Sequence, residues 1–276
     1  MVGRDRIAAL VGADDVASYA RDGVCVLRGI FDATWLSTLR AGVEHNLAEP
    51  GPYAGEYGHG EGKIFDDYCN WERIAEYRSF VYDSLAAAIA AAVMQSPSAQ
   101  FFHEHVLVKE PGTAKRTPWH HDAPYYCVDG RQTVSFWIPL DPVPQDVCPE
   151  FVAGSHNWGK LFYPRSFADD TDYEYDGDVF ETIPNIEQDR EAYDICSWAL
   201  EPGDVILFHF RTVHGAPANP GQGRRRGFAP RWHGEDARFV ARPGRTSPPY
   251  PGIGQTTGER LREDWFPVIW PPKEAD

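Results

Sequence analysis

The feature that most restricts the fold of this chain is a change of pattern near residue 100, after which short apolar runs alternate with turns. Strand-like runs occupy residues 101–109, 133–138 and 204–210. The pairs Pro111-Gly112 and Pro202-Gly203 mark turns next to the first and last runs. Short strands joined by turns are typical of a β-sandwich or jelly roll. The 25 glycines and 23 prolines among the 276 residues suit the many turns of such a fold.

The first hundred residues predict mainly helices. Asp32 can cap a helix that carries Leu36, Leu39 and Val43 on one face. The other expected segments are a short helix at 14–21, a buried strand at 23–27, a glycine-rich loop at 53–62 and one or two helices within 71–94. The predicted fold is therefore mainly β with flanking helices, which form a layer beside a jelly roll.

The domain organisation predicted from this pattern is one domain over residues 1–276, because no segment resembles a linker and no internal repeat is visible. Residues 1–99 form its mostly helical N-terminal layer, residues 100–240 its jelly-roll core and residues 241–276 a C-terminal extension. The acidic, aromatic segment 169–178 interrupts the strand pattern. It reads equally well as a mobile lid and as a solvated surface loop.

Charge and cysteine content restrict the partners and the compartment. A formal net charge of -15 argues against a general nucleic-acid binder, which needs clustered Lys and Arg. The longest apolar stretch, residues 84–94, is too short to span a bilayer. The N-terminus shows no signal-peptide pattern. The five cysteines have no CxxC spacing and indicate reduced thiols in a cytoplasmic protein: Cys25, Cys69, Cys127, Cys148 and Cys196.

A histidine and an aspartate two residues apart, His120 and Asp122, form the motif that carries the most chemistry. If they lie on a strand, both side chains point to the same face, and Trp119 and His121 point to the other. An imidazole and a carboxylate side by side supply two of the three ligands of a non-haem iron site. His214, which follows the apolar run 204–210, is the expected third ligand.

Three protein ligands on one face of a metal leave its other positions open. Two of them can take a bidentate 2-oxo acid and one can take O2. A short HxD pattern alone is unspecific, and its combination with a distant histidine after an apolar strand is what favours the metal site.

The run Arg224-Arg225-Arg226 offers a partner for a buried carboxylate of 2-oxoglutarate, because arginine is always charged and binds carboxylates with two nitrogens. Strand alternation places Arg225 on one face and its two neighbours on the other. The opposing interpretation is a solvated run of charge.

These residues belong to a longer set of motifs, in the right order from residue 101 to about 232. The chain resembles the phytanoyl-CoA dioxygenase family of iron(II)/2-oxoglutarate oxygenases. The motifs that carry the resemblance are VKEPGT (108–113), TPWHHDAPYY (117–126), SFWIPLD (135–141), EFVAGSH (150–156) and the segment 201–219.

The resemblance implies a double-stranded β-helix, a cupin-like jelly roll, with iron(II), 2-oxoglutarate and O2 at its open mouth. It assigns iron binding to His120, Asp122 and His214, and the 2-oxoglutarate carboxylate to Arg225. It also implies that Trp137 lies beside the cosubstrate and that His103 lies on a strand that contacts it.

The sequence departs from the family pattern at several points. Ala216 stands where a serine frequently helps to hold 2-oxoglutarate, and Arg226 is a rival to Arg225. Residues 145–149 replace a more usual acidic, glycine-containing turn, and we have no physical account of that change.

The expected reaction is hydroxylation of an unactivated C–H bond in a small organic substrate, with release of succinate and CO2. Candidate substrate residues are Tyr125, Tyr126, Lys109 and Arg231, for each of which ordinary packing or surface charge is an equal explanation. Two alternatives remain open at this point: a non-catalytic jelly-roll binding protein, and a cupin-like metalloenzyme that does not use 2-oxoglutarate. Only the 2-oxoglutarate hypothesis needs Arg225.

Overall fold

Two antiparallel sheets form the body of the molecule in the computed structural model, which describes residues 1–276 except 1–6, 8, 59–61, 168–170, 174–178 and 273–276. The large sheet has the strand order β1-β10-β7-β12-β4-β3-β2, with β14 paired to β4. The smaller sheet has the order β5-β11-β8-β9, and β13 pairs with β6 in a separate ribbon. This arrangement confirms the predicted mainly β jelly roll.

The strands of the large sheet are β1 (Val24–Leu27), β2 (Gly55–Tyr57), β3 (Ile64–Tyr68), β4 (Ala99–Lys109), β7 (Thr133–Pro139), β10 (Val205–Phe208), β12 (Arg225–His233) and β14 (Val268–Trp270). Those of the smaller sheet are β5 (Thr117–His120), β8 (Glu150–Val152), β9 (Ile195–Cys196) and β11 (His214–Ala216). The ribbon consists of β6 (Val128–Asp129) and β13 (Arg238–Phe239). Short 3-10 helices occupy Ala123–Tyr125, Gln145–Val147, Ser155–Asn157 and Arg190–Ala192.

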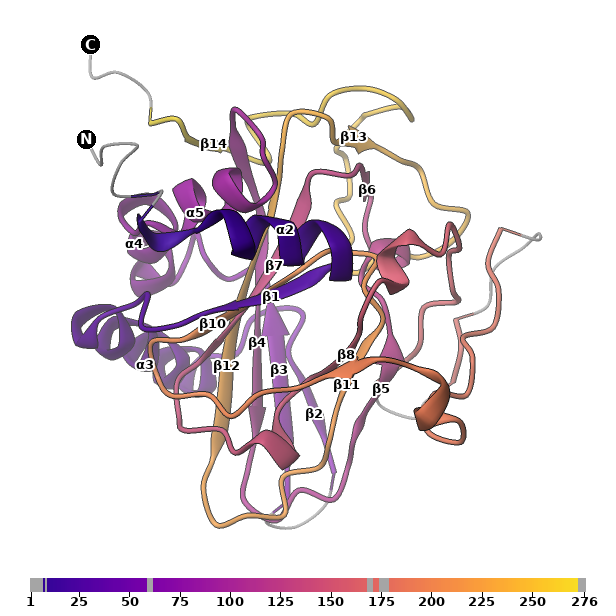
Figure 1. The fold of residues 1–276 in the computed structure, drawn as a ribbon. Coiled ribbons are helices and arrows are strands. Elements are labelled where there is room, and N and C mark those ends of the chain that lie inside the picture. The colour runs from indigo at the N-terminus through magenta and orange to yellow at the C-terminus, as the bar shows by residue number, and fades with distance from the viewer. Residues whose placement is uncertain (1–6, 8, 59–61, 168–170, 174–178, 273–276) are drawn as a thin grey trace.

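Among the described residues, four helices cover one side of the large sheet, and the smaller sheet lies on the other side (Figure 1). They are α2 (Ala13–Asp22), α3 (Ala33–Ala48), α4 (Ala75–Asp83) and α5 (Ala86–Val93). As predicted, Asp32 caps α3, because its side chain accepts a hydrogen bond of 3.0 Å from the Trp35 amide. Leu39 and Val43 of α3 are fully buried against the sheet and the other helices.

The alternation of side chains in the large sheet separates two environments. On β4, Val106 and Val108 are buried in the core between the sheet and the helices. Leu107, which lies between them, points to the opposite face, toward the smaller sheet. β4 and β12 are paired over nine register positions, from Arg225–Lys109 to His233–Gln100. This long pairing gives the space between the two sheets a rigid wall.

Two predictions about the N-terminal part were incomplete or wrong. Residues 53–62 were expected to form a loop, but Gly55–Tyr57 pairs with Ile64–Tyr68 as the β2–β3 hairpin at the sheet edge. The first 99 residues thus supply β1, β2 and β3 to the large sheet as well as the helical layer. Most of the acidic segment 169–178 lies outside the described residues, and the structure describes only residues 171–173 of it.

The described part of the chain contains no helix that is both long and apolar enough to cross a membrane.

Candidate metal centre

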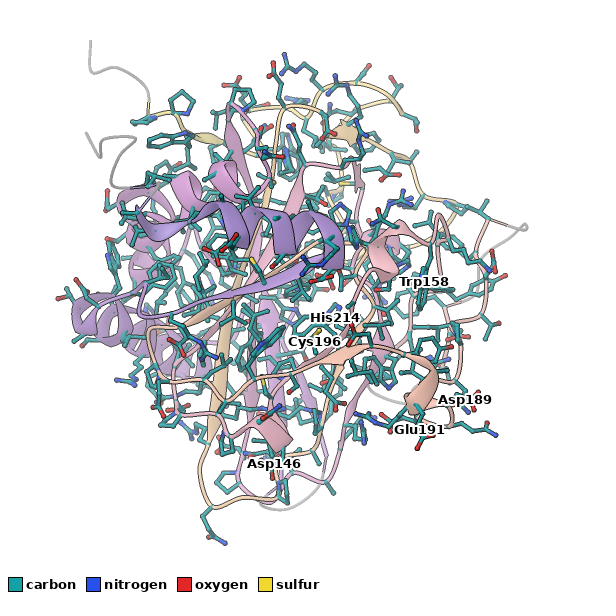
Figure 2. The ribbon with its side chains drawn as sticks, in the orientation of Figure 1. Asp146, Trp158, Asp189, Glu191, Cys196 and His214 are labelled. Carbon is teal, nitrogen blue, oxygen red and sulfur yellow. The ribbon has the colours of Figure 1, made fainter. Side chains whose placement is uncertain are left out.

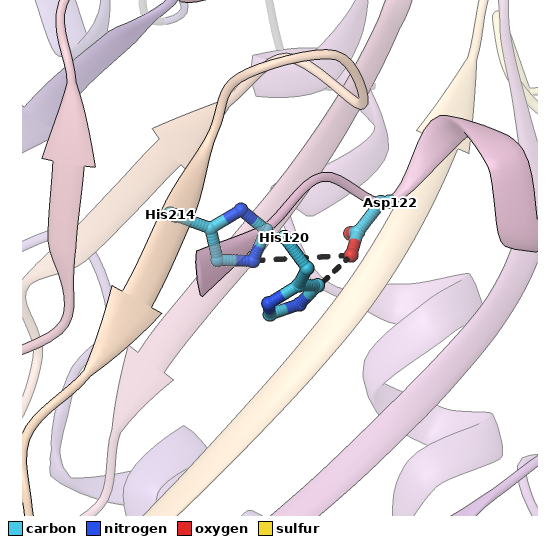
Figure 3. A group of neighbouring side chains, drawn as sticks. All are labelled: His120, Asp122 and His214. Atoms are coloured by element: carbon cyan, nitrogen blue, oxygen red, sulfur yellow. Dashed lines mark ion pairs between the residues drawn. The ribbon is translucent and has the colours of Figure 1, made fainter. Parts of the chain in front are cut away.

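His120, Asp122 and His214 come together between the two sheets. One ligand atom of each lies within 4.8 Å of the others, and among the described residues this is the one group of at least three His, Cys, Asp or Glu side chains with such a geometry. Asp122 Oδ1 is 3.8 Å from Nε2 of His120 and 3.8 Å from Nε2 of His214 (Figure 3). The three atoms surround a space that suits one metal ion.

The two histidines are brought together by strand pairing. His120 is the last residue of β5, and His214 is the first residue of β11, its direct register partner. Figure 2 shows His214 in the interior of the molecule, whereas Asp146 and Glu191 lie at its edge. His214 follows β10 by a few residues, as expected, and the structure adds that a turn separates β10 from β11 and that His214 begins the new strand.

Asp122 reaches the site by a different route from the one the sequence suggested. The strand ends at His120, and Asp122 has helical backbone angles (φ -71, ψ -34) at the start of the 3-10 turn Ala123–Tyr125. The explanation by strand alternation is therefore wrong for Asp122, although its carboxylate does converge with the imidazole. His121 points away as predicted, and its Nε2 accepts a hydrogen bond of 2.9 Å from the Phe162 amide.

Backbone carbonyls fix the orientation of both imidazoles. His120 Nδ1 lies 2.8 Å from the Pro118 carbonyl, and His214 Nδ1 lies 2.9 Å from the Thr212 carbonyl. Each Nδ1 therefore carries the proton and donates it, which leaves a lone pair on Nε2 directed at the site. A second group of contacts fixes the carboxylate: Asp122 Oδ2 accepts from Ser135 Oγ at 2.9 Å and from Arg231 Nε at 3.4 Å.

The protonation states suit metal binding. Burial, together with the nearby His214, lowers the pKa of His120 to about 3, and burial also lowers the pKa of His214. Burial acts to raise the pKa of Asp122, but Arg231, the two histidines and the Ser135 hydroxyl together bring it below its usual range. At neutral pH two neutral imidazoles thus face one ionised carboxylate, and these are the forms that bind metal ions.

A cavity of about 430 Å³ is lined by these three side chains. This volume is within the usual range for small-molecule sites. Trp137, His103, Tyr125, Tyr126 and Arg231, which the sequence proposed for cosubstrate or substrate contacts, all line it. Its outer part is formed by the loop before β2 and by segments near residues 165–167 and 245–247.

Arg225 and Lys109 do not line this cavity. They pair with each other across the sheet, two register positions beyond the pair of Gly227 and Leu107, which does line the cavity. Both donate to the Pro217 carbonyl, at 3.1 Å from Arg225 Nη2 and 3.0 Å from Lys109 Nζ. Arg225 also donates to the Val147 carbonyl. The structure therefore buries Lys109 next to Arg225, outside the cavity lining and away from the substrate position that the sequence suggested for it.

These two cations lack an acidic partner within the described part of the chain. Burial lowers the pKa of Arg225 to about 10. Burial and the nearby charges of Arg225, Arg116 and Lys115 lower the pKa of Lys109 to about 6. By contrast, Arg226 pairs with Asp141 at 2.7 Å, so the predicted alternation along this strand is confirmed. Arg226 therefore does not compete with Arg225 for a ligand between the two sheets.

Several polar residues in or behind the cavity wall were missed by the sequence analysis. Ser135 holds Asp122, and the signal that could have found it was its position two residues before Trp137 on the same strand face. Asp66 and His105 line the cavity as a pair, with Oδ2 and Nε2 3.2 Å apart. Asp66 escaped notice because its strand was not predicted.

The jelly roll and its buried set of two histidines and one carboxylate are typical of non-haem iron oxygenases. The sequence profile described as "Phytanoyl-CoA dioxygenase (PhyH)" matches residues 19–227, so the chain belongs to the phytanoyl-CoA dioxygenase family. It is a 2-oxoglutarate-dependent dioxygenase that works with iron(II) and O2. The donor set, two nitrogens and one carboxylate oxygen, fits iron(II).

Curated relatives agree with this assignment. "Dioxygenase lolE1" of Epichloe uncinata is 25% identical over 225 residues, which cover 78% of this chain and 80% of that protein. "Dioxygenase cdmD" of Talaromyces verruculosus is 25% identical over 252 residues, with 80% and 73% covered.

Two solved structures share the fold. The non-heme alpha-ketoglutarate-dependent carbocyclase SnoK from nogalamycin biosynthesis aligns with a TM-score of 0.73 at 24% identity, over 95% of this chain and 98% of that one. EctD from S. alaskensis, solved with 2-oxoglutarate and 5-hydroxyectoine, aligns with a TM-score of 0.64 at 19% identity, over 87% and 82%.

Proposed function

We propose that this dioxygenase hydroxylates an unactivated C–H bond of a small organic substrate and releases succinate and CO2. The observation that carries the proposal is the convergence of Asp122 Oδ1 with Nε2 of His120 and of His214 at the inner end of a cavity. These three residues are the proposed iron ligands. Bound iron(II) with 2-oxoglutarate and O2 supplies the oxidising chemistry.

The protein's part in the reaction is to orient the ligands. The carbonyls of Pro118 and Thr212 hold the imidazoles so that each Nε2 faces the metal position. Ser135 and Arg231 occupy Asp122 Oδ2, and this leaves Oδ1 as the ligand atom. Because three protein ligands occupy one side, the cavity side stays available to cosubstrate and O2.

The distal carboxylate of 2-oxoglutarate is proposed to bind at Arg225 and Lys109. Two buried basic groups without an acidic partner are unfavourable in the unliganded chain, and an anion between them would pair with Arg225 and favour the protonated form of Lys109. Trp137 and Gly227 form the adjacent cavity wall, along which the cosubstrate would extend from the metal to this pair. His103 lines the same cavity, and its proposed role is contact with the substrate.

Two of the candidate substrate residues support the site from behind. The Tyr125 hydroxyl donates to the Arg165 carbonyl at 2.7 Å and so holds the segment that carries Phe167 over His120. The Arg231 guanidinium lies over the Tyr126 ring, with its Cζ 5.7 Å from the centre of the ring. Arg231 itself contacts Asp122, so its proposed role moves from substrate anchor to positioning of the carboxylate.

A cytoplasmic location is part of the proposal and rests on the five cysteines, all of which are free thiols in the structure. Nucleic acid is not a proposed partner, since the formal net charge is -15.

The experiment that tests the function is an anaerobic titration of the chain with iron(II) and 2-oxoglutarate, followed by the visible charge-transfer absorption of their complex. We expect a band in the native chain, none in His120→Ala and a strongly raised 2-oxoglutarate requirement in Arg225→Ala. Arg224→Ala is the matched control, because Arg224 pairs with Glu110 on the other face of the strand and should leave the band unchanged. A folded, metal-loaded chain without a band would contradict the proposal.

A further inference from the structure

The inner face of β4 presents two histidines to the cavity outside the set of metal ligands. His103 and His105 are two residues apart on this strand, so their side chains lie on the same face. Both line the cavity, together with Leu107 further along the strand. They belong to the large sheet, whereas His120 and His214 belong to the smaller one. The cavity thus has a histidine wall opposite the sheet that carries the histidine ligands.

Other polar groups of the sheet walls are already engaged within the protein. Arg231 contacts Asp122, and the Tyr125 hydroxyl is bonded to the backbone of Arg165. Ser135 donates to the same Asp122 carboxylate. A substrate that enters the cavity therefore meets few groups on the sheets that still need a hydrogen bond.

The two wall histidines do have unused nitrogen atoms. His103 is only 2% exposed and lines the cavity, and no described residue bonds to either of its ring nitrogens, of which Nδ1 is enclosed by protein. His105 uses Nε2 to contact Asp66 Oδ2 at 3.2 Å, and no described residue bonds to its Nδ1. A ligand hydroxyl that reaches such a nitrogen makes a hydrogen bond that the described residues do not make, and it gains affinity there.

Asp66 fixes the direction in which His105 can act. The carboxylate is 5% exposed and lies beside Nε2, which therefore carries a proton. Nδ1 of a neutral His105 is then an acceptor for a hydroxyl group. This acid–histidine pair exists because β3, at the edge of the sheet, is paired to β4 with Tyr68 opposite His105.

Aromatic rings complete this wall. The Tyr68 ring packs edge to face with both imidazoles, and its centre lies 5.6 Å from that of His105 and 6.4 Å from that of His103. Tyr53 stacks on Tyr68 with ring centres 4.9 Å apart and an angle of 4°. Phe167 covers His120 at 4.8 Å. Flat faces at the mouth and near the metal position favour a rigid, ring-containing body over a flexible chain.

We propose that the wall of His103, His105 and Asp66 is the subsite that recognises the substrate, and that the substrate is a neutral, hydroxylated ring compound. Its hydroxyl groups donate to the free imidazole nitrogens, and its rings pack against Tyr53, Tyr68 and Phe167. This inference rests on the proposed function, because it deepens the same active site.

The charges of the wall disfavour the other chemical classes. The Asp66 carboxylate repels an anionic group that approaches His105, and the Arg231 charge, paired in register with His103, repels a cationic one. Arg231 is not available to an anion, since it contacts Asp122. A neutral hydroxyl satisfies the imidazoles without either repulsion.

The test measures binding of three matched probes to the full chain loaded with Mn(II) and 2-oxoglutarate, by isothermal titration calorimetry. The probes are 2-naphthol, its methyl ether 2-methoxynaphthalene and the anion 2-naphthoate. We expect 2-naphthol to bind about three- to tenfold tighter than the ether, as one hydrogen bond predicts. This ratio should fall to about one in His105→Phe and in His103→Phe, which keep the ring volume.

His45→Phe is the matched control, because His45 lies on α3 beside Glu49 and Glu76, outside the cavity lining, and its ratio should stay native. If a buried His103→Phe chain does not fold, Asp66→Asn serves instead and should also reduce the ratio. Preference for 2-naphthoate, a ratio that survives both histidine variants, or no binding of any probe would overturn the proposal. The iron–2-oxoglutarate band, recorded without probe, separately reports on the proposed oxygenase function.

Discussion

At the scale of single residues, Asp122 shows how the site is ordered, since its two carboxylate oxygens have different partners. Oδ1 faces the two imidazoles, and Oδ2 accepts from Ser135 and Arg231. Groups behind the ligands that hold them in place typically change metal affinity by about 10- to 100-fold when removed. The free Oδ1 therefore depends on two side chains that do not touch the metal position themselves.

Ser135→Ala should weaken metal binding about tenfold, because Asp122 loses the shorter of the two hydrogen bonds to Oδ2 and can rotate. Mn(II) binding, followed by the electron paramagnetic resonance of the free ion, measures this directly. Ser79→Ala, which removes a hydroxyl bonded to Asp83 on exposed α4, should leave the affinity native. An unchanged affinity in Ser135→Ala would show that Arg231 alone orients the carboxylate.

The residues that converge could be predicted from the sequence better than the backbone that carries them. Residue types and spacing singled out His120, Asp122 and His214, and these three do lie together. The chain leaves the strand after His120, however, and a turn delivers Asp122. Turn geometry of this kind depends on tertiary contacts, such as the Ala123 amide bonded to the Phe210 carbonyl, which no local pattern shows.

At the scale of elements, β12 and β7 pack so closely that only glycine fits at one point beside the cavity. Gly227 pairs with Pro139, and a Cβ built on it would lie 2.6 Å from Trp137 Nε1. Trp137 lines the cavity on the path from the metal position to Arg225. The pairing of two strands thus determines where the indole lies.

Gly227→Ala should displace Trp137 into the cavity and weaken 2-oxoglutarate binding about tenfold, while overpacking lowers the free energy of unfolding by about 1–3 kcal/mol. Titration of the iron–2-oxoglutarate band and urea unfolding measure the two effects. Gly223→Ala is the control, because a Cβ at Gly223 meets nothing within 4 Å and both quantities should stay native. Native binding in Gly227→Ala would mean that the indole does not border the cosubstrate.

Strands with regular apolar patterns could be predicted from the sequence, whereas the β2–β3 hairpin could not. Residues 64–68 contain two adjacent aspartates, which break the alternation expected of a strand. In the structure Asp66 faces the cavity beside His105, and Asp67 on the other face accepts from Asn46 and the Gly51 amide. Each acid is stabilised by partners distant in sequence, so local propensity gave no signal for this strand.

At the scale of the whole molecule, the net charge is negative, whereas the proposed cosubstrate site consists of basic side chains. The chain has a formal net charge of -15, yet Lys109 and Arg225 are buried side by side without an acid among the described residues. An anionic cosubstrate therefore gains its affinity from local contacts and not from the field of the whole protein. At such a site the protonation of Lys109 is linked to both folding and cosubstrate binding.

Lys109 determines the sign of that coupling. Its pKa in the folded chain is about 6, whereas an unperturbed lysine titrates near about 10.4. Between these values the unfolded chain holds the proton and the folded chain does not, so stability without cosubstrate rises with pH across this window and is lowest below its acidic end. The charged groups that face Lys109, namely Arg225, Arg116 and Lys115, all disfavour its proton.

Binding of 2-oxoglutarate should reverse this preference, because a carboxylate next to Lys109 favours the protonated amine. Affinity is then highest below the pKa of the unliganded lysine and weakens as the pH rises above it, by up to about tenfold per pH unit. The pKa of His120, about 3, is too low for that ligand to titrate in the same window. Calorimetric titrations with Mn(II) present, at about pH 6.5 and about pH 8.5, should show the loss of affinity in the native chain and in the surface control Lys160→Met. Lys109→Met should bind more weakly with little dependence on pH, and a slope equal to that of the native chain would place the proton on another group.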